Sequence, residues 1–290
     1  MTNRGGRQPT LMAVHAHPDD EASQTGGTLA KYSAAGWRTV VVTCTDGAQG
    51  DGSGGRKSGD FCHRPEEVSR RRSYELSMSR VALGISDLIE LKYPDSGTSG
   101  LANVGDVQNF AELDGFFVAH RIEALMRDYE PDVIITYPPN GFSCHPDHIQ
   151  VYKATVAAFR RICDDGGFSE FRQPAGVMSF RLPRLYYIAI SETRLRHMRL
   201  RAADTLEADS WVPPLASEDS AIQAVVDVSG FWREKMRALA AHASQSGAAS
   251  LLRVLDGLEV NDQVEEYLQA FPSQFDERPE KGLLGGLLES

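Results

Sequence analysis

The order of the hydrophobic patterns in this sequence predicts an α/β fold, in which helices cover both faces of a mostly parallel sheet. Four short apolar runs have the length of buried strands, and segments with helical periodicity lie between them. Strands that alternate with helices favour parallel pairing. Ligands of such sheets bind beyond the carboxyl ends of the strands, so we expect functional residues in the loops that follow the strands.

The elements can be assigned in chain order. The four strand candidates of the first half are residues 11–16, 38–45, 87–93 and 132–137. Apolar residues recur at helical spacing over residues 118–129 and again over 149–159. Residues 46–65 are rich in Gly, Ser and charge, which predicts a long loop near the ligand-binding edge. Residues 184–190 are a further strand candidate, and 231–246 a further helix candidate.

Length and composition indicate one domain with an added segment. We expect a flexible leader (residues 1–10), a catalytic core (11–190) and a C-terminal elaboration of the same domain (191–290). The net charge of −10 argues against nucleic acid or an anionic membrane as a partner, and no apolar run approaches the roughly 20 residues of a membrane span. Four cysteines without CxxC spacing predict reduced thiols in a cytoplasmic protein. A homo-oligomer is compatible with these features.

Two histidine motifs carry the chemistry. The run 17–21 (HPDDE) directly follows the first strand candidate, and the run 145–148 (HPDH) follows the fourth. A catalytic zinc site uses three nitrogen or oxygen ligands and keeps one position open. His17 and Asp20 are three residues apart at a helix start and can point the same way. With His148 they form a two-histidine, one-carboxylate set, which predicts bound zinc, with Fe²⁺ as the alternative.

The remaining members of the two motifs have expected catalytic roles. Asp19 could act as the general base toward an attacking water. His145 could polarise a substrate carbonyl in its protonated form, or protonate the leaving group, with Asp147 orienting it and raising its basicity. Acids are also favoured in first helical turns for structural reasons alone. A non-catalytic binding protein is the competing class, but it needs neither Asp19 beside the ligands nor His145 opposite them.

These motifs have a counterpart in a known family. The sequence resembles the LmbE-like (PIG-L) N-deacetylases, which include mycothiol-pathway enzymes, over residues 11–162. The segments that carry the resemblance are AHPDDE at 16–21, HPDH at 145–148, Asn140-Gly141 and, more weakly, Arg72-x-x-Glu75-Leu76 and Asp95-Ser96-Gly97. The resemblance implies a Rossmann-like fold and the same metal ligands, base and carbonyl-polarising residue as above. It also implies a small-molecule N-acetylglucosaminyl conjugate as substrate, with removal of an acyl group.

Substrate contacts follow from the resemblance. Arg72, Asp95 and Asn140 occupy positions that the family uses to bind substrate. Mycothiol enzymes carry a tyrosine two residues before the HPDH motif, where this sequence has Ser143. Tyr137 is one residue that could replace it, and a different substrate is the other explanation. An activity like that of mycothiol S-conjugate amidase, which cleaves a glucosaminyl amide, is the alternative function.

Overall fold

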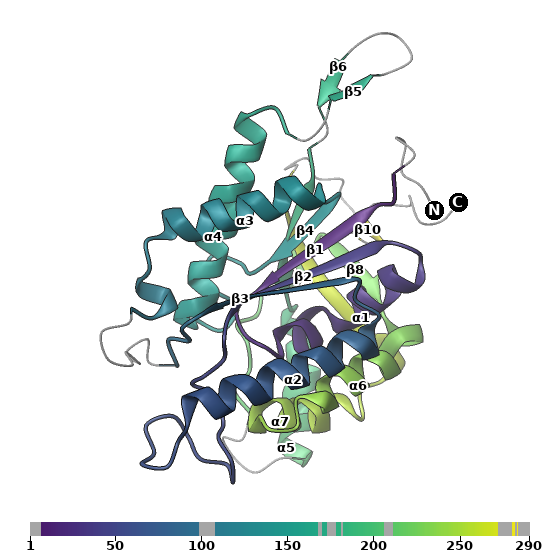
Figure 1. Cartoon of the computed structure of the whole chain (residues 1–290). Helices are drawn as coiled ribbons and strands as arrows, with labels where there is room; N and C mark the ends of the chain where they lie inside the picture. The colour runs from purple at the N-terminus through teal and green to yellow at the C-terminus, as the bar shows by residue number, and fades with distance from the viewer. Residues whose placement is uncertain are drawn as a thin grey trace.

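The sheet at the centre of the molecule has eight strands in the order β10-β8-β9-β7-β4-β1-β2-β3 (Figure 1). The computed structural model describes residues 7–98, 108–167, 170–172, 178–180, 182–205, 211–271, 280–281 and 283. The strands are β1 (Thr10–His15), β2 (Arg38–Thr45), β3 (Asp87–Tyr93), β4 (Val133–Thr136), β7 (Arg184–Ala189), β8 (Ala224–Asp227), β9 (Val264–Phe271) and β10 (Glu280–Lys281). A separate hairpin joins β5 (Glu170–Arg172) and β6 (Met178–Phe180).

The strands from β3 to β7 are parallel, as the sequence predicts, and β9 and β8 continue the sheet in antiparallel fashion. At the centre, Ala13 of β1 pairs with Val41 of β2 on one side and Ile135 of β4 on the other. β1 is buried along its whole length, and in β2 only the first residue, Arg38, is not. Continuous apolar strands are what a parallel sheet covered on both faces requires.

Helices cover both faces of the sheet (Figure 1). α3 and α4 pack together on one face, whereas α1, α2 and α6 pack together on the other. The helices are α1 (Asp20–Ala34), α2 (Pro65–Leu83), α3 (Gly115–Tyr129), α4 (Pro146–Asp164), α5 (Glu192–Thr205), α6 (Trp232–Ala241) and α7 (Ser246–Leu255). Short 3₁₀ turns are η1 (Phe110–Glu112), η2 (Asp219–Ala221), η3 (Ser229–Phe231) and η4 (Val260–Asp262). None of the described helices is both long and apolar enough to cross a membrane.

The strand predictions are confirmed. The strands expected at 38–45 and 87–93 have the observed bounds, and those at 11–16, 132–137 and 184–190 agree to within one residue at each end. No helix or strand occurs in the loop between β2 and α2.

The single helix expected over 231–246 is wrong. The chain forms α6, a turn at residues 242–245, and then α7. The helix is interrupted because polar groups in the turn bind other elements. His242 lies 2.8 Å from a carboxylate oxygen of Glu21, and Ser244 donates from its backbone N and its Oγ to Glu75.

Both ends of the described chain attach to the core. Within the leader expected at 1–10, Arg7 pairs with Asp132 at 3.0 Å, and the backbone N of Thr10 donates to the same carboxylate. β8 and β9 lie in the same sheet as β1 and β4. This shared sheet supports the proposal that residues 191–290 are an elaboration of one domain.

The strand order places a switch point beside β1. The chain leaves β1 for β2 on one side, whereas β4 lies on the other. Loops that follow the two neighbouring strands β1 and β4 therefore diverge and open a crevice at their carboxyl ends. Both histidine motifs begin at this crevice, one before α1 and one before α4.

Candidate metal centre and active site

His17, Asp20 and His148 place three possible metal-ligand atoms at the corners of a small triangle. His17 Nδ1 lies 3.2 Å from His148 Nε2, and Asp20 Oδ2 lies 3.5 Å from each of these nitrogens. Ligands held at about 2.0–2.2 Å from a tetrahedral metal are roughly 3.3–3.6 Å apart. The triangle therefore has the size of one face of a zinc coordination shell, and its two imidazoles and one carboxylate suit a catalytic site.

The two histidines are oriented by their second nitrogens. His148 Nδ1 donates to the carbonyl of Gly141 at 2.9 Å, which leaves the Nε2 lone pair facing the triangle. Gly141 has φ 68, and a Cβ there would lie 3.0 Å from the Cβ of His148, so the close approach requires glycine. His17 Nε2 donates to Asp147 Oδ2 at 3.1 Å, which leaves Nδ1 for a metal. Such outer partners fix the tautomer and direction of ligand imidazoles.

Asp147 therefore acts on His17, and the expectation that it orients His145 is wrong. Its carboxylate is fully buried and accepts hydrogen bonds from His17 Nε2 and from the backbone N and Oγ of Ser96. Only the backbone N of Asp147 reaches His145, donating to Nδ1 at 3.2 Å. The backbone N–H of Asp147 lies in the first turn of α4 and donates to the imidazole of His145, which caps the helix. The side chain of Asp147 instead points toward the loop that contains Ser96.

The hydrogen bonding of His145 defines which tautomer the neutral ring adopts. Because Nδ1 accepts the hydrogen bond at the start of α4, the proton of the neutral ring is on Nε2. Burial, followed by the neighbouring His17 and His148, lowers the pKa of His145 to about 2. A pKa this low favours the neutral ring over the protonated His145 expected from the sequence. Nitrogens of His17, His145 and His148 all lie within 4.8 Å of one another, so His145 is also within reach of a metal.

Asp19 is the more accessible acid of the first motif. Its side chain is 24% exposed, against 7% for Asp20. Arg72 donates to its Oδ2 at 3.1 Å, whereas Oδ1 has no hydrogen-bond partner among the residues that the structure describes. Burial raises the pKa of Asp19 to about 6, against the opposing effect of Arg72. The carboxylate is therefore suited to accept a proton near neutral pH.

Asp19 is also held in a strained conformation. Its φ of 125° is rare for a residue with a side chain and costs about 1–3 kcal/mol. Its backbone N donates to Glu21 Oε2 at 3.0 Å. Glu21 is fully buried, and its other oxygen contacts Ser79 Oγ and His242 Nε2. This buried network holds Asp19 in place.

The three expected substrate-binding residues lie in different environments. Arg72 is 4% exposed and donates to the carbonyls of Gly47 and Pro18 as well as to Asp19. Asp95 is 4% exposed and accepts hydrogen bonds from the backbone of neighbouring loop residues. Asn140 has an exposed position beside the HPDH loop. Arg72 and Asp95 thus fix the loops around Asp19, and direct substrate contact stays a prediction for all three.

Tyr137 does not replace the tyrosine that the resemblance leads one to expect at Ser143. Tyr137 is fully buried, and its hydroxyl donates to Asp20 Oδ2 at 2.7 Å while it accepts from the backbone N of Ala16 at 2.9 Å. Its ring stacks on that of His148 with centroids 4.2 Å apart. Both hydrogen bonds of the hydroxyl are therefore made within the protein, and one of them holds the carboxylate of Asp20. Ser143 Oγ lies 3.4 Å from His148 Nδ1.

No role for Glu21, Ser79 or His242 follows from the motifs in the sequence. The signal for His242 was a polar run, HASQS at 242–246, that interrupts an apolar helical pattern. Its partner Glu21 is 221 residues away in the chain, so no local pattern reveals the contact.

A mostly parallel sheet with two imidazoles and a carboxylate at its switch point defines an α/β protein with a candidate metal centre. The PIG-L family model, described as GlcNAc-PI de-N-acetylase, matches residues 12–159, and the chain belongs to this family. Among its relatives is a 1D-myo-inositol 2-acetamido-2-deoxy-alpha-D-glucopyranoside deacetylase of Rhodococcus erythropolis, 35% identical over 81% of this chain and 80% of the relative. The protein of the same name from Thermobifida fusca is 34% identical over 82% and 84%.

Solved structures confirm the fold. N,N'-diacetylchitobiose deacetylase from Pyrococcus horikoshii has a TM-score of 0.53 at 18% identity, covering 81% of this chain and 70% of its own. The hydratase GalB from Pseudomonas putida has a TM-score of 0.59 at 14% identity, covering 93% and 99%. A deacetylase and a hydratase share this fold, so the activity has to be argued from the site.

Proposed function

We propose that this protein is a metal-dependent N-deacetylase that removes the acetyl group from a 2-acetamido-2-deoxyglucosyl conjugate. The observation that carries the proposal is the triangle of His17, Asp20 and His148, with Asp19 on one side and His145 on the other. The names of the two curated relatives support both the amide and the sugar. They also favour deacetylation over the amidase-like alternative.

The residues of the site have distinct roles in the proposed reaction. His17, Asp20 and His148 would hold a divalent metal, which when bound activates water and polarises a carbonyl. Asp19 accepts the proton of the attacking water through its free oxygen. The Nε2–H of His145 donates to the amide oxygen as that oxygen becomes negative. Asp19 then returns the proton to the departing amine, which yields acetate and a free amino sugar.

Zinc is the proposed metal. Two imidazoles and one carboxylate form a familiar catalytic zinc set, and the spacing of the triangle matches it. Fe²⁺ accepts the same donors and is the alternative. The four cysteines, without CxxC spacing, support a reducing compartment, and we propose that the enzyme works in the cytoplasm.

Acetate release from N-acetylglucosaminyl conjugates tests the proposal. Metal-loaded protein should release acetate, and a chelator should abolish the release until Zn²⁺ is restored. His17→Ala and His148→Ala should lose both metal and activity, because each opens a second coordination position. Asp256→Asn, which changes an exposed acid after α7, is the matched control and should retain both. Full metal content in both histidine variants would contradict the ligand assignment.

A further inference from the structure

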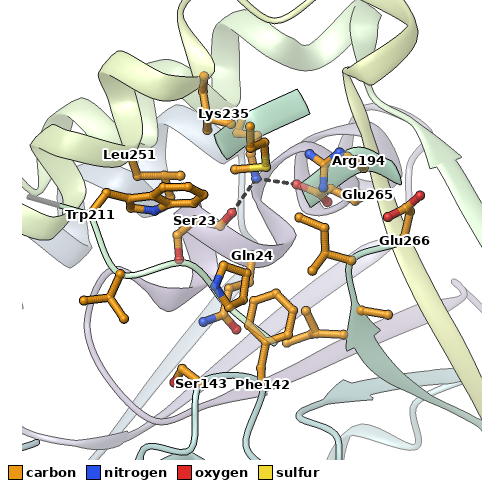
Figure 2. A pocket seen from close by; sticks show the side chains of 17 residues that line it. Ser23, Gln24, Phe142, Ser143, Arg194, Trp211, Lys235, Leu251, Glu265 and Glu266 are labelled. Carbon is orange, nitrogen blue, oxygen red and sulfur yellow. Dashed lines mark hydrogen bonds and ion pairs between the residues drawn. The ribbon is translucent and has the colours of Figure 1, made fainter. Parts of the chain in front are cut away.

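A cavity of about 180 Å³ lies between α1, the loop before α4 and the C-terminal segment (Figure 2). Ten of its seventeen lining residues are apolar. Its walls come from α1, β7 and the loop before α4, and from the C-terminal segment through α5, α6, α7 and residues 211–214. Much of this wall therefore lies beyond residues 12–159, the part that matches the family model.

Two residues that line the cavity contact the residues of the candidate metal centre. Gln24, which lines it, donates to Asp20 Oδ1 at 2.8 Å. Ser143, which also lines it, lies 3.4 Å from His148 Nδ1. The cavity is therefore one side chain away from Asp20 and His148, which is close enough for one substrate molecule to extend from the metal centre toward it.

The outer walls are built for an apolar group. Trp211 and Leu251 lie together on one side of the cavity, and Phe142 lies across from them (Figure 2). The wall is attached to the active-site loop, because the backbone N of Leu215 donates to the carbonyl of Phe142 at 2.8 Å. Few hydrogen-bonding groups are available on these walls to replace the water around a polyol.

The charged end of the cavity is balanced. Lys235 pairs with Glu265 at 2.6 Å and also donates to the carbonyl of Ser23 (Figure 2). Glu266 accepts hydrogen bonds from the backbone N and Oγ of Ser191, and Arg194 Nε donates to a backbone carbonyl. Two cations and two carboxylates leave no net charge to attract an ionic ligand.

We propose that this cavity binds the aglycone of the substrate and that the aglycone is an uncharged, largely apolar group. A cavity of about 150 Å³ accepts benzene, so the occupant has the size of one aromatic ring or a short alkyl chain. The inference rests on the proposed deacetylation, because an acetyl group is too small to need this space. The inositol in the names of the relatives is a polyol and fits these walls poorly.

Deacetylation of a matched series tests the aglycone. The substrates are the phenyl, hexyl, methyl and inositol 2-acetamido-2-deoxy-α-D-glucopyranosides, with zinc-loaded full-length protein. The phenyl and hexyl compounds should exceed the methyl compound in kcat/KM by about 10- to 100-fold, as burial of one ring or chain predicts. In Trp211→Ala the phenyl-to-methyl ratio should fall toward 1. Phe117→Ala removes an aromatic side chain that is 71% exposed on α3, and it should keep the wild-type ratio.

A binding measurement separates failure of this inference from failure of the proposed function. Calorimetry with phenyl and methyl 2-amino-2-deoxy-α-D-glucopyranoside requires no turnover. The phenyl compound should bind at least tenfold more tightly to the wild type, and Trp211→Ala should remove the difference. Preferred turnover of the inositol compound, or equal binding of the two amines, would overturn the inference even where acetate is released. A Trp211-dependent gain from a longer N-acyl chain instead would assign the cavity to the acyl group and overturn it as well.

Discussion

Replacing Asp147 by Asn should weaken metal binding by about 10- to 100-fold, because Asp147 orients His17, one of the proposed metal ligands. Asp147 Oδ2 accepts the hydrogen bond of His17 Nε2 at 3.1 Å, inside a site where Asp147 has no exposed surface. A hydrogen bond to a charged group contributes about 1.5–3 kcal/mol, against about 0.5–1.5 kcal/mol for a neutral one. Loss of the negative charge should therefore cost about 1–2 kcal/mol of hydrogen-bond free energy. If the Asn side chain turns its NH₂ group toward His17 Nε2, two donors face each other and the cost rises further.

The assay is competition for Zn²⁺ against a chromophoric chelator, with kcat measured separately at saturating metal. The affinity should fall more than kcat does, since the base and His145 remain. Asp256→Asn serves as the control for a lost carboxylate at an exposed position. If Asp147→Asn binds zinc like the wild type but loses kcat, Asp147 acts on His145 and the geometric assignment is refuted.

Four further results are expected. Asp19→Asn should keep its metal while kcat falls by about 10²–10⁴-fold, since it removes the base; near-normal kcat would move the base to another residue. His145→Ala should lower kcat on the order of 10²–10³-fold, and His145→Gln, which retains an N–H donor, should lose less; metal loss in either variant would make His145 a ligand. His242→Ala leaves buried Glu21 short of a partner and should lower the free energy of unfolding in urea by about 1–3 kcal/mol, whereas an unchanged value would show that the contact is not needed. Zn²⁺ should raise the Tm of the wild type and not that of His17→Ala, because binding to the folded state alone stabilises it; equal shifts would place the metal elsewhere.

Much of the catalytic core could be predicted from the sequence because the signals are local. Strand length and helical periodicity identified β1 to β4, α3 and α4, since burial on two faces or one imposes those patterns over a few residues. The two histidine motifs follow β1 and β4, and the carboxyl ends of parallel strands share one edge of the sheet. His17 and His148 could therefore be assigned to one site before any contact was known.

Only the tertiary structure decided how the site is held. Asp147 turned to His17, 130 residues away, instead of to its neighbour His145, and Tyr137 was committed to Asp20. The residues near Asp147 and Tyr137 in the sequence do not reveal these contacts. The direction of a side chain in a first helical turn depends on which loop packs beside it. The aglycone cavity likewise exists only where the C-terminal segment meets the loop before α4. The sequence by itself determined which chemical groups gather at the edge of the sheet, and packing between distant segments determined what each group touches.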